Sequence, residues 1–131
     1  MRLVATTLIL AAALLAVPSV QAQDAAAGET VFKKCIACHA VGEGAKTKVG
    51  PVLNGIVDRP AASIEGFAYS AAMKESGLTW DEATLATYLQ APKALVKGTK
   101  MAFVGLKADA DIANVIAYLK QFDADGNKIA P

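Results

Sequence analysis

The residues best suited to chemistry are two cysteines and a histidine grouped in one run, Cys35-Ile36-Ala37-Cys38-His39. Two thiols separated by two residues can lie on one helical turn and add to the two vinyl groups of one haem. The histidine that follows then lies beneath the iron and offers an imidazole nitrogen to it. His39 is the only histidine in the chain, and the motif occurs once. The spacing therefore predicts one covalently attached haem c.

Other chemistry of the same residues fits less well. A zinc site usually needs four Cys, His or carboxylate ligands, and the chain has only these three Cys and His residues. A redox-active dithiol of the thioredoxin type is typical of a βαβ pattern, and we find no convincing strand. A disulfide between Cys35 and Cys38 would be strained and would leave His39 without a role. Haem attachment explains all three side chains.

The first 22 residues have the composition of a cleaved signal peptide. Arg2 precedes a mostly apolar run from Leu3 to Val17, which is shorter than the ~20 residues of a membrane span. Pro18 follows, and then Val20-Gln21-Ala22 forms a small-x-small cleavage site. An uncleaved anchor is the alternative. We expect residues 1–22 to be removed and residues 23–131 to form a single domain in the periplasm.

Charge argues against a nucleic-acid partner. The chain has 13 Lys and Arg against 12 Asp and Glu, and loss of Arg2 with the signal peptide would make the domain formally neutral. Binding to nucleic acid usually needs a strongly basic domain. A domain of this size buries only a marginal core, to which a haem would add a large apolar face. We therefore expect the haem-free form to fold poorly.

The elements that must position the motif are predicted to be helices and loops. Asp24 is a suitable N-cap for a first helix that gives way near His39. Residues 42–66 are rich in glycine and proline, and so long a loop in a small domain is expected to wrap around something. Within it, the carbonyl of Pro51 could accept the ring proton of His39 and fix its tautomer.

Three more helices are predicted after this loop. A short one runs from Ser70 as N-cap to Ser76, and a second begins at a capping box formed by Thr79 and Glu82 and ends at Pro92. The last spans roughly residues 109–122, where apolar residues recur at helical spacing. The fold class is therefore all-α.

The chain resembles the class I c-type cytochromes, specifically the cytochrome c2 and mitochondrial cytochrome c group, over essentially all of residues 23–131. The resemblance rests on the haem motif and on the following segments: Gly50-Pro51, Leu53, Arg59, Gly66-Phe67, Tyr69, Thr79-Trp80, Tyr88-Leu89, Pro92, Gly98-Thr99-Lys100-Met101-Ala102-Phe103 and Ala117-Tyr118-Leu119-Lys120. It implies a compact cytochrome c fold in which the N- and C-terminal helices cross, with Gly28 allowing their close approach, and loops wrap the haem.

The resemblance also implies roles for individual residues. Met101 would be the second axial ligand, opposite His39, and Tyr88 would hydrogen-bond near its sulfur. Pro51 would accept the His39 ring proton. The haem propionates would be hydrogen-bonded, directly or through water, by Arg59, Tyr69, Trp80 and Thr99. One departure is Met73, which stands where the family often carries an Asn of a buried polar network, and which leaves the exact reduction potential open.

With both axial positions filled, the implied function is one-electron transfer, and the protein is not expected to be an enzyme. We expect a monomer whose exposed haem edge is ringed by Lys34, Lys48, Lys93 and Lys100, and which docks acidic redox partners. Suitable partners are a cytochrome bc1 complex, a photosynthetic reaction centre, an oxidase or a periplasmic dehydrogenase. Two alternatives remain, a ligand-binding or peroxidatic haem protein with a displaceable Met101, and an electron-carrying subunit of a larger enzyme.

Overall fold

The computed structural model describes residues 23–129, so the predicted signal peptide lies outside the described residues. The helices of this part are α1 (Ala25–Phe32), α2 (Ala71–Glu75), α3 (Glu82–Gln90), α4 (Pro92–Leu95) and α5 (Asp109–Leu119). Strand pairing over residues 23–129 is limited to two isolated bridges, Pro60 with Thr79 and Phe122 with Lys128. The prediction of an all-α fold is confirmed. None of the helices within residues 23–129 combines the length and the apolar character that a membrane crossing requires.

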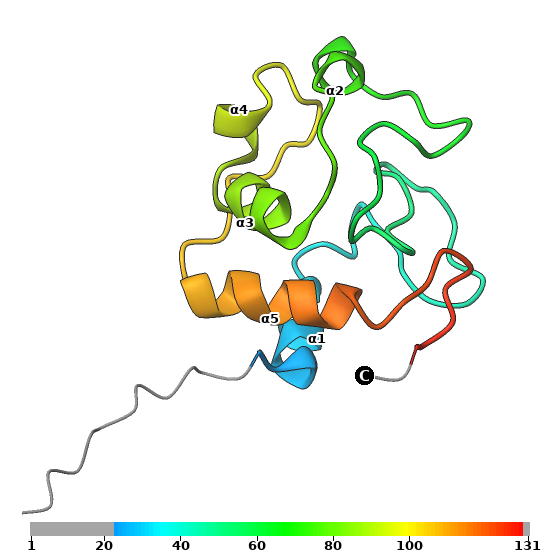
Figure 1. The fold of residues 1–131 in the computed structure, drawn as a ribbon, viewed down its shortest axis with the longest axis vertical. Coiled ribbons are helices and arrows are strands. Elements are labelled where there is room, and N and C mark those ends of the chain that lie inside the picture. The colour runs from blue at the N-terminus through cyan, green and yellow to red at the C-terminus, as the bar shows by residue number, and fades with distance from the viewer. Residues whose placement is uncertain (1–22, 130–131) are drawn as a thin grey trace, which may run out of the picture.

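The most extensive contact between helices is the crossing of α1 and α5, drawn in blue and orange in Figure 1. Gly28 makes the close approach possible, because a Cβ atom there would lie 1.9 Å from the Asn114 carbonyl oxygen. Beside this point the rings of Phe32 and Tyr118 pack with their centroids 5.4 Å apart. The apolar face of α5 is buried against α1 and α3 through four further side chains, Ile112, Val115, Ile116 and Leu119.

The start of α1 agrees with its prediction, but its end does not. The Asp24 carboxylate accepts hydrogen bonds from the backbone N–H groups of Ala26 and Ala27, which makes it the N-cap. The prediction that the helix continues to near His39 is wrong, because regular α-helix ends at Phe32. Residues 33–38 instead form successive turns, in which several N–H groups bond to the third residue back. Turns of this kind wind the backbone more tightly than an α-helix does, just before the cysteines.

The caps of the later helices also differ in part from their predictions. Ser70 caps α2 as expected, with its hydroxyl oxygen accepting from the Met73 N–H at 3.1 Å. The prediction of Thr79 as the N-cap of α3 is wrong, since Asp81 accepts from the Thr84 N–H at 2.7 Å. Thr79 belongs to the bridge with Pro60 instead. Pro92 ends α3 as expected and also begins α4.

Residues 42–66 contain no helix or named strand, as predicted, and wrap one side of the molecule. Buried Asn54 holds this loop by a pair of hydrogen bonds to Gly42, accepting from its N–H at 2.8 Å and donating to its carbonyl at 3.0 Å. Gly126 packs on the same spot, where a Cβ atom would lie 2.1 Å from the Gly42 oxygen. The loop is thus tied to the C-terminal segment and keeps a defined shape without regular structure.

Candidate functional site

The Cys35–His39 segment forms a tight turn after α1. The backbone N–H groups of Cys38 and His39 both donate to the Cys35 carbonyl, at 3.1 and 2.9 Å. Both cysteines are free thiols, with Cys35 half-buried and Cys38 exposed. Burial raises the pKa of the Cys35 thiol, partly offset by the nearby Lys34 ammonium. The pair is therefore available for bonding on one side of a compact turn.

His39 is held in one orientation by the loop that follows. Its Nδ1 atom lies 2.7 Å from the Pro51 carbonyl oxygen, so the proton of a neutral ring is carried on Nδ1 and donated there. Gly50 packs on the ring, where a Cβ atom would lie only 2.4 Å from Cε1. Burial lowers the pKa of the imidazole, the hydrogen bond to Pro51 opposes this change, and the positive charges of Arg59 and Lys48 lower the pKa further. These effects favour the neutral ring, in which Nε2 carries the lone pair.

Met101 lies in the loop between α4 and α5 and is held by two hydroxyl groups. The Tyr88 hydroxyl donates to its Sδ at 3.4 Å and also lies 3.1 Å from Thr99 Oγ1. The backbone N–H of Met101 donates to the same Thr99 oxygen at 3.2 Å. Tyr88 is buried and packs against Trp80, with ring centroids 4.8 Å apart. The thioether is therefore fixed by a rigid part of the core.

Arg59 carries a buried donor that the described residues leave without a partner. Its Nη1 donates to the carbonyl oxygens of Val52 at 3.2 Å and Asn54 at 2.9 Å, whereas its Nε is buried and unpaired. Tyr69 accepts from the Ile64 N–H at 3.1 Å, which leaves its own hydroxyl proton free to be donated. Burial lowers the pKa of the guanidinium, which nevertheless stays charged. These donors suit a partly buried anionic group.

Comparison with known proteins identifies the family in which this arrangement of residues occurs. The family model for cytochrome c matches residues 25–123. Cytochrome c2 of Blastochloris viridis is 57% identical over 107 residues, 82% of this chain and 84% of that protein. Cytochrome c2 of Rhodoblastus acidophilus is 59% identical over 107 residues, 82% of this chain and 100% of that protein. The solved cytochrome c2 of Rhodospirillum centenum superposes with a TM-score of 0.72 at 42% identity, over 76% of this chain and 98% of that one.

The chain belongs to the cytochrome c family. It is a mono-haem c-type electron-transfer protein rather than an enzyme, and one haem c is covalently attached to it. The predicted compact cytochrome c fold is confirmed by the solved relatives.

The positions of the residues in this cytochrome suit a bound haem. The paired thiols of one turn suit attachment to the two vinyl groups of a haem, and an imidazole with a free Nε2 and a thioether held by a hydroxyl are donors suited to its iron. The unpaired Nε of Arg59 supplies a donor of the kind that a propionate requires. No three His, Cys, Asp or Glu side chains within residues 23–129 gather as a site for a bare metal ion.

The predicted site residues of the cytochrome fall into two groups by the contacts they make. His39, Pro51 and Arg59 belong to the haem motif and the 42–66 loop. Tyr88, Thr99 and Met101 are joined by hydrogen bonds between α3 and the loop before α5, with Trp80 packed on Tyr88. Thr99 was expected at a propionate, yet its oxygen bonds Tyr88 and Met101. Tyr69 packs edge-on against Phe67, with centroids 4.7 Å apart.

The four lysines predicted at the docking edge are all exposed. Lys34 lies 3.9 Å from the Asp111 carboxylate, an exposed pair that contributes little to stability. Lys48 donates to the Ile36 carbonyl within the haem motif, and Lys100 donates to the Ala68 carbonyl at 3.3 Å. Lys93 projects from the short helix α4. Three of these lysines therefore have a polar partner. Lys34 pairs with the Asp111 carboxylate, and Lys48 and Lys100 each donate to a backbone carbonyl.

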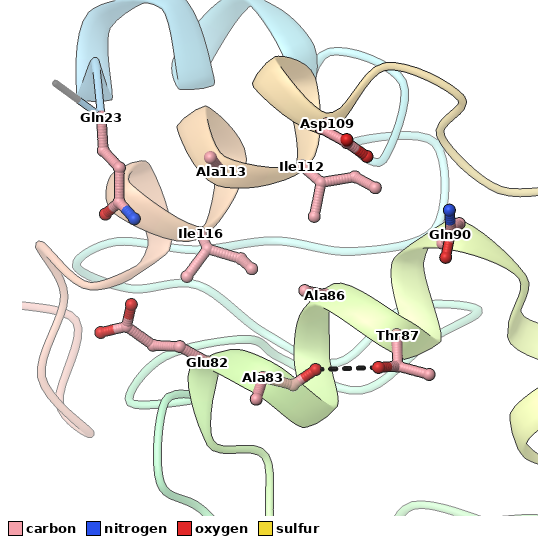
Figure 2. Close-up of a pocket in the computed structure, with 10 residues that line it drawn as sticks. All are labelled: Gln23, Glu82, Ala83, Ala86, Thr87, Gln90, Asp109, Ile112, Ala113 and Ile116. Atoms are coloured by element: carbon pink, nitrogen blue, oxygen red, sulfur yellow. Dashed lines mark hydrogen bonds between the residues drawn. The ribbon is translucent and has the colours of Figure 1, made fainter. Parts of the chain in front are cut away.

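Sequence reasoning missed Asn54, whose amide fastens the 42–66 loop beneath Arg59. An Asn inside a glycine-rich loop is ordinarily a turn residue, so its type gave no signal that it is buried. Sequence reasoning also missed a groove between α3 and α5, lined by small and apolar residues such as Ala86 and Ile116 (Figure 2). None of the predicted haem or docking residues lines this groove. It is a feature of helix packing separate from the site.

Proposed function

We propose that this cytochrome is a periplasmic one-electron carrier whose haem is bonded to Cys35 and Cys38 and ligated by His39 and Met101. The observation that carries the proposal is the 2.7 Å contact between His39 Nδ1 and the Pro51 carbonyl. This bond uses the one proton of the neutral ring and leaves Nε2 as the nitrogen for iron. The lowered pKa of the imidazole supports the same state, because a protonated ring could not ligate.

The ligand set explains why electron transfer is the function. The iron supplies a change of one electron between its ferric and ferrous forms, and a His and Met pair raises the potential of that change relative to other axial sets. If His39 and Met101 both hold the iron, neither a substrate nor oxygen would find an open coordination site. Pro51 holds the imidazole and Tyr88 holds the thioether. Because the fold fixes both the imidazole and the thioether, the protein rearranges little when the charge of the iron changes.

The propionates are proposed to be held, directly or through water, by Arg59, Tyr69, Trp80 and Thr99. The buried Arg59 Nε supports this assignment, since an unpaired buried donor is costly unless a partner is supplied. The Tyr69 hydroxyl has its proton to donate after accepting from Ile64. Trp80 has a single indole N–H, which makes it a donor only. Cationic and neutral donors together would compensate the charge of two partly buried carboxylates.

Docking is proposed to use the face that carries Lys34, Lys48, Lys93 and Lys100, on a monomer released from its signal peptide (residues 1–22). Partners with acidic docking surfaces fit such a face, which includes a cytochrome bc1 complex, a reaction centre, an oxidase or a periplasmic dehydrogenase. Exposed side chains with at most weak ion pairs support the proposal, because their charges remain available to a partner.

The test is a redox titration of the purified holoprotein with optical spectra. We expect a low-spin spectrum, a charge-transfer band of Met–iron ligation in the ferric form and a high one-electron potential. Met101→Ala should abolish the band and allow carbon monoxide to bind, whereas Met73→Leu, at the buried methionine of α2, should do neither. A high-spin spectrum, a low potential or ready binding of carbon monoxide by the unaltered protein would favour a ligand-binding or peroxidatic haem protein.

A further inference from the structure

Asn54 is the one asparagine of the chain that a glycine follows, because Asn114 precedes a valine and Asn127 precedes a lysine. Gly55 has no side chain to hinder its backbone nitrogen, which in a flexible chain can reach the side-chain carbonyl of the residue before it. An asparagine in this position is prone to lose its amide. The Asn54-Gly55 pair is therefore the most reactive amide site that the amino-acid sequence contains.

Loss of the amide needs no reagent other than water. The Gly55 backbone nitrogen forms a bond to the Asn54 Cγ atom and gives up its proton, the bond between Cγ and Nδ2 breaks, and ammonia leaves. Water then opens the cyclic imide at either of its two carbonyl carbons. The products carry aspartate at position 54, or isoaspartate, in which the backbone runs through the former side chain.

In the folded protein both reacting groups are held. Asn54 is buried, and its amide accepts from the Gly42 N–H at 2.8 Å and donates to the Gly42 carbonyl at 3.0 Å. The Gly55 N–H donates to the Phe122 carbonyl at 3.3 Å. Gly126 packs so closely on the amide that a Cβ atom there would lie 2.6 Å from Asn54 Nδ2. The loop must therefore open before the two groups can react.

We infer that Asn54-Gly55 is a deamidation site that the folded 42–66 loop protects, so that a chain that stays unfolded is altered irreversibly. The inference does not depend on the proposed ligands of the iron. Either product lacks the amide donor that the Gly42 carbonyl accepts from. Isoaspartate also takes the original Asn54 carbonyl out of the backbone, where its oxygen accepts from Arg59 Nη1 at 2.9 Å. An altered chain cannot rebuild both hydrogen bonds to Gly42.

The test compares the holoprotein in buffer with the same holoprotein unfolded in denaturant, since the haem stays covalently attached in both samples. Both are incubated at mildly alkaline pH, where the backbone nitrogen loses its proton more readily. Peptide mass spectrometry then follows the conversion of amide to acid at each asparagine. Asn127 is exposed and followed by lysine, so it is the internal control. Gly55→Ala in denaturant is the matched variant, because its methyl group hinders the attacking nitrogen without an effect on folding.

In denaturant, Asn54 should lose its amide much faster than Asn127, and much faster than it does in the Gly55→Ala variant. In the folded holoprotein the rate at Asn54 should be lower by about 30-fold or more, a factor that corresponds to about 2 kcal/mol, or two hydrogen bonds. Equal rates at Asn54 in buffer and in denaturant would overturn the protection. A rate in denaturant no faster than that of Asn127 would overturn the site itself.

Gly126→Ala should weaken the protection without altering either reacting residue. The added Cβ would lie 2.6 Å from Asn54 Nδ2 and 2.1 Å from the Gly42 oxygen, so the rate at Asn54 in buffer should rise. Gly77→Ala is the control, because it has φ of +64° and open space. Equal rates in the two variants would overturn protection by this packing. The comparison of buffer with denaturant decides the inference should Gly126→Ala not fold.

The consequence for the loop is measured on holoprotein that has lost the Asn54 amide in denaturant and is then returned to buffer. This fraction should unfold at a lower denaturant concentration than the unaltered fraction, because a hydrogen bond to Gly42 is lost. Equal unfolding midpoints would overturn the claim that deamidation damages the loop.

Discussion

His39 depends on two neighbours for its orientation, the Pro51 carbonyl on one edge of its ring and Gly50 on its side. A carbonyl acceptor fixes the tautomer, and the missing side chain of Gly50 gives the ring room. Burial favours the neutral imidazole, which is the form that ligates a metal. The chemistry of the site is thus set by residues that do not themselves ligate.

Gly50→Ala should disturb His39 more than it disturbs the backbone. The added Cβ would lie 2.4 Å from the ring, whereas the φ angle at Gly50 is not among the positive values. We expect a loss of about 1–3 kcal/mol of stability from overpacking, together with an altered haem spectrum. Thermal unfolding and optical spectra would measure both. Gly44→Ala is the control, because it has φ of +70° and open space, so backbone strain alone should leave the spectrum unchanged.

Asn54→Ala should destabilise the 42–66 loop. It removes both hydrogen bonds to Gly42 and leaves the part-buried Gly42 N–H without its partner, while the Gly42 carbonyl keeps the Ala45 N–H at 3.2 Å. The expected loss is about 1–3 kcal/mol in denaturant unfolding of the holoprotein. Asn54→Asp keeps the acceptor but faces the Gly42 carbonyl with an oxygen, so it should cost no less than the alanine. An aspartate variant as stable as wild type would contradict the role given to the amide donor.

At the scale of the helices, the crossing of α1 and α5 sets the distance between the N-terminal haem motif and the C-terminal part of the chain. Phe32, at the end of α1, packs on Tyr118 of α5 and is followed directly by the turns that present the cysteines. A change at this crossing is therefore transmitted to the motif through rigid helices.

Gly28→Ala should be among the most damaging substitutions in the chain. The new Cβ would overlap the Asn114 carbonyl at 1.9 Å and the Tyr118 Cβ at 2.8 Å, and neither can move without shifting α5. We expect a loss of at least about 3 kcal/mol, measured by chemical denaturation. The exposed neighbour Thr30 supplies the control, since Thr30→Ala should change stability by no more than about 0.5 kcal/mol. Similar losses for both variants would argue against close packing at Gly28.

The N-cap of α3 predicts a stability difference that depends on pH. Hydrogen bonds from the Thr84 backbone and side chain hold the pKa of Asp81 below its ordinary value of 3.8. The stabilisation is therefore present above pH 3.8 and is lost as the pH falls through the lower pKa of the folded state. Asp81→Ala should lower the unfolding midpoint at pH 7, and the difference from wild type should shrink in acid. Thr79→Ala should have little effect at either pH; the reverse ranking would restore Thr79 as the cap.

At the scale of the whole molecule, opposite charges are unevenly placed. Along the chain, acidic residues are concentrated around residues 65–82 and 109–125, whereas the four lysines proposed for docking lie in or near the haem motif, the 42–66 loop, α4 and the Met101 loop. A molecule with nearly equal numbers of positive and negative charges can still orient in the field of a partner if one face carries an excess of one sign.

Charge reversal at Lys93 or Lys100 should slow electron transfer to an acidic partner at low salt. Both side chains are exposed, so the main effect is on the encounter rate, and the difference should shrink as ionic strength rises. Stopped-flow kinetics with purified bc1 complex over a range of salt concentrations would measure it. Lys128→Glu, in the C-terminal segment beside Phe122, carries the same change of charge and should leave the rate nearly unchanged. Equal slowing by all three would place the docking face elsewhere.

The amino-acid sequence by itself determined the haem motif, the helical composition and the caps Asp24 and Ser70. These features depend on residues close together in the chain, where covalent geometry limits the possible distances. The sequence also predicted that Pro51 would accept from His39, a hydrogen bond that the structure contains. Pro51 is rigid and lies twelve positions after the only histidine, so few other carbonyl groups were candidates for the acceptor.

Only the tertiary structure decided where Thr99 and Asn54 direct their polar atoms and which residue caps α3. The Thr99 oxygen meets a tyrosine eleven positions away, and Asn54 meets Gly42 across a loop. Asp81 became the cap because the bridge of Thr79 with Pro60 shifts the start of the helix. Each outcome depends on how segments pack after the chain folds, and a buried polar atom bonds whichever partner that packing brings within reach.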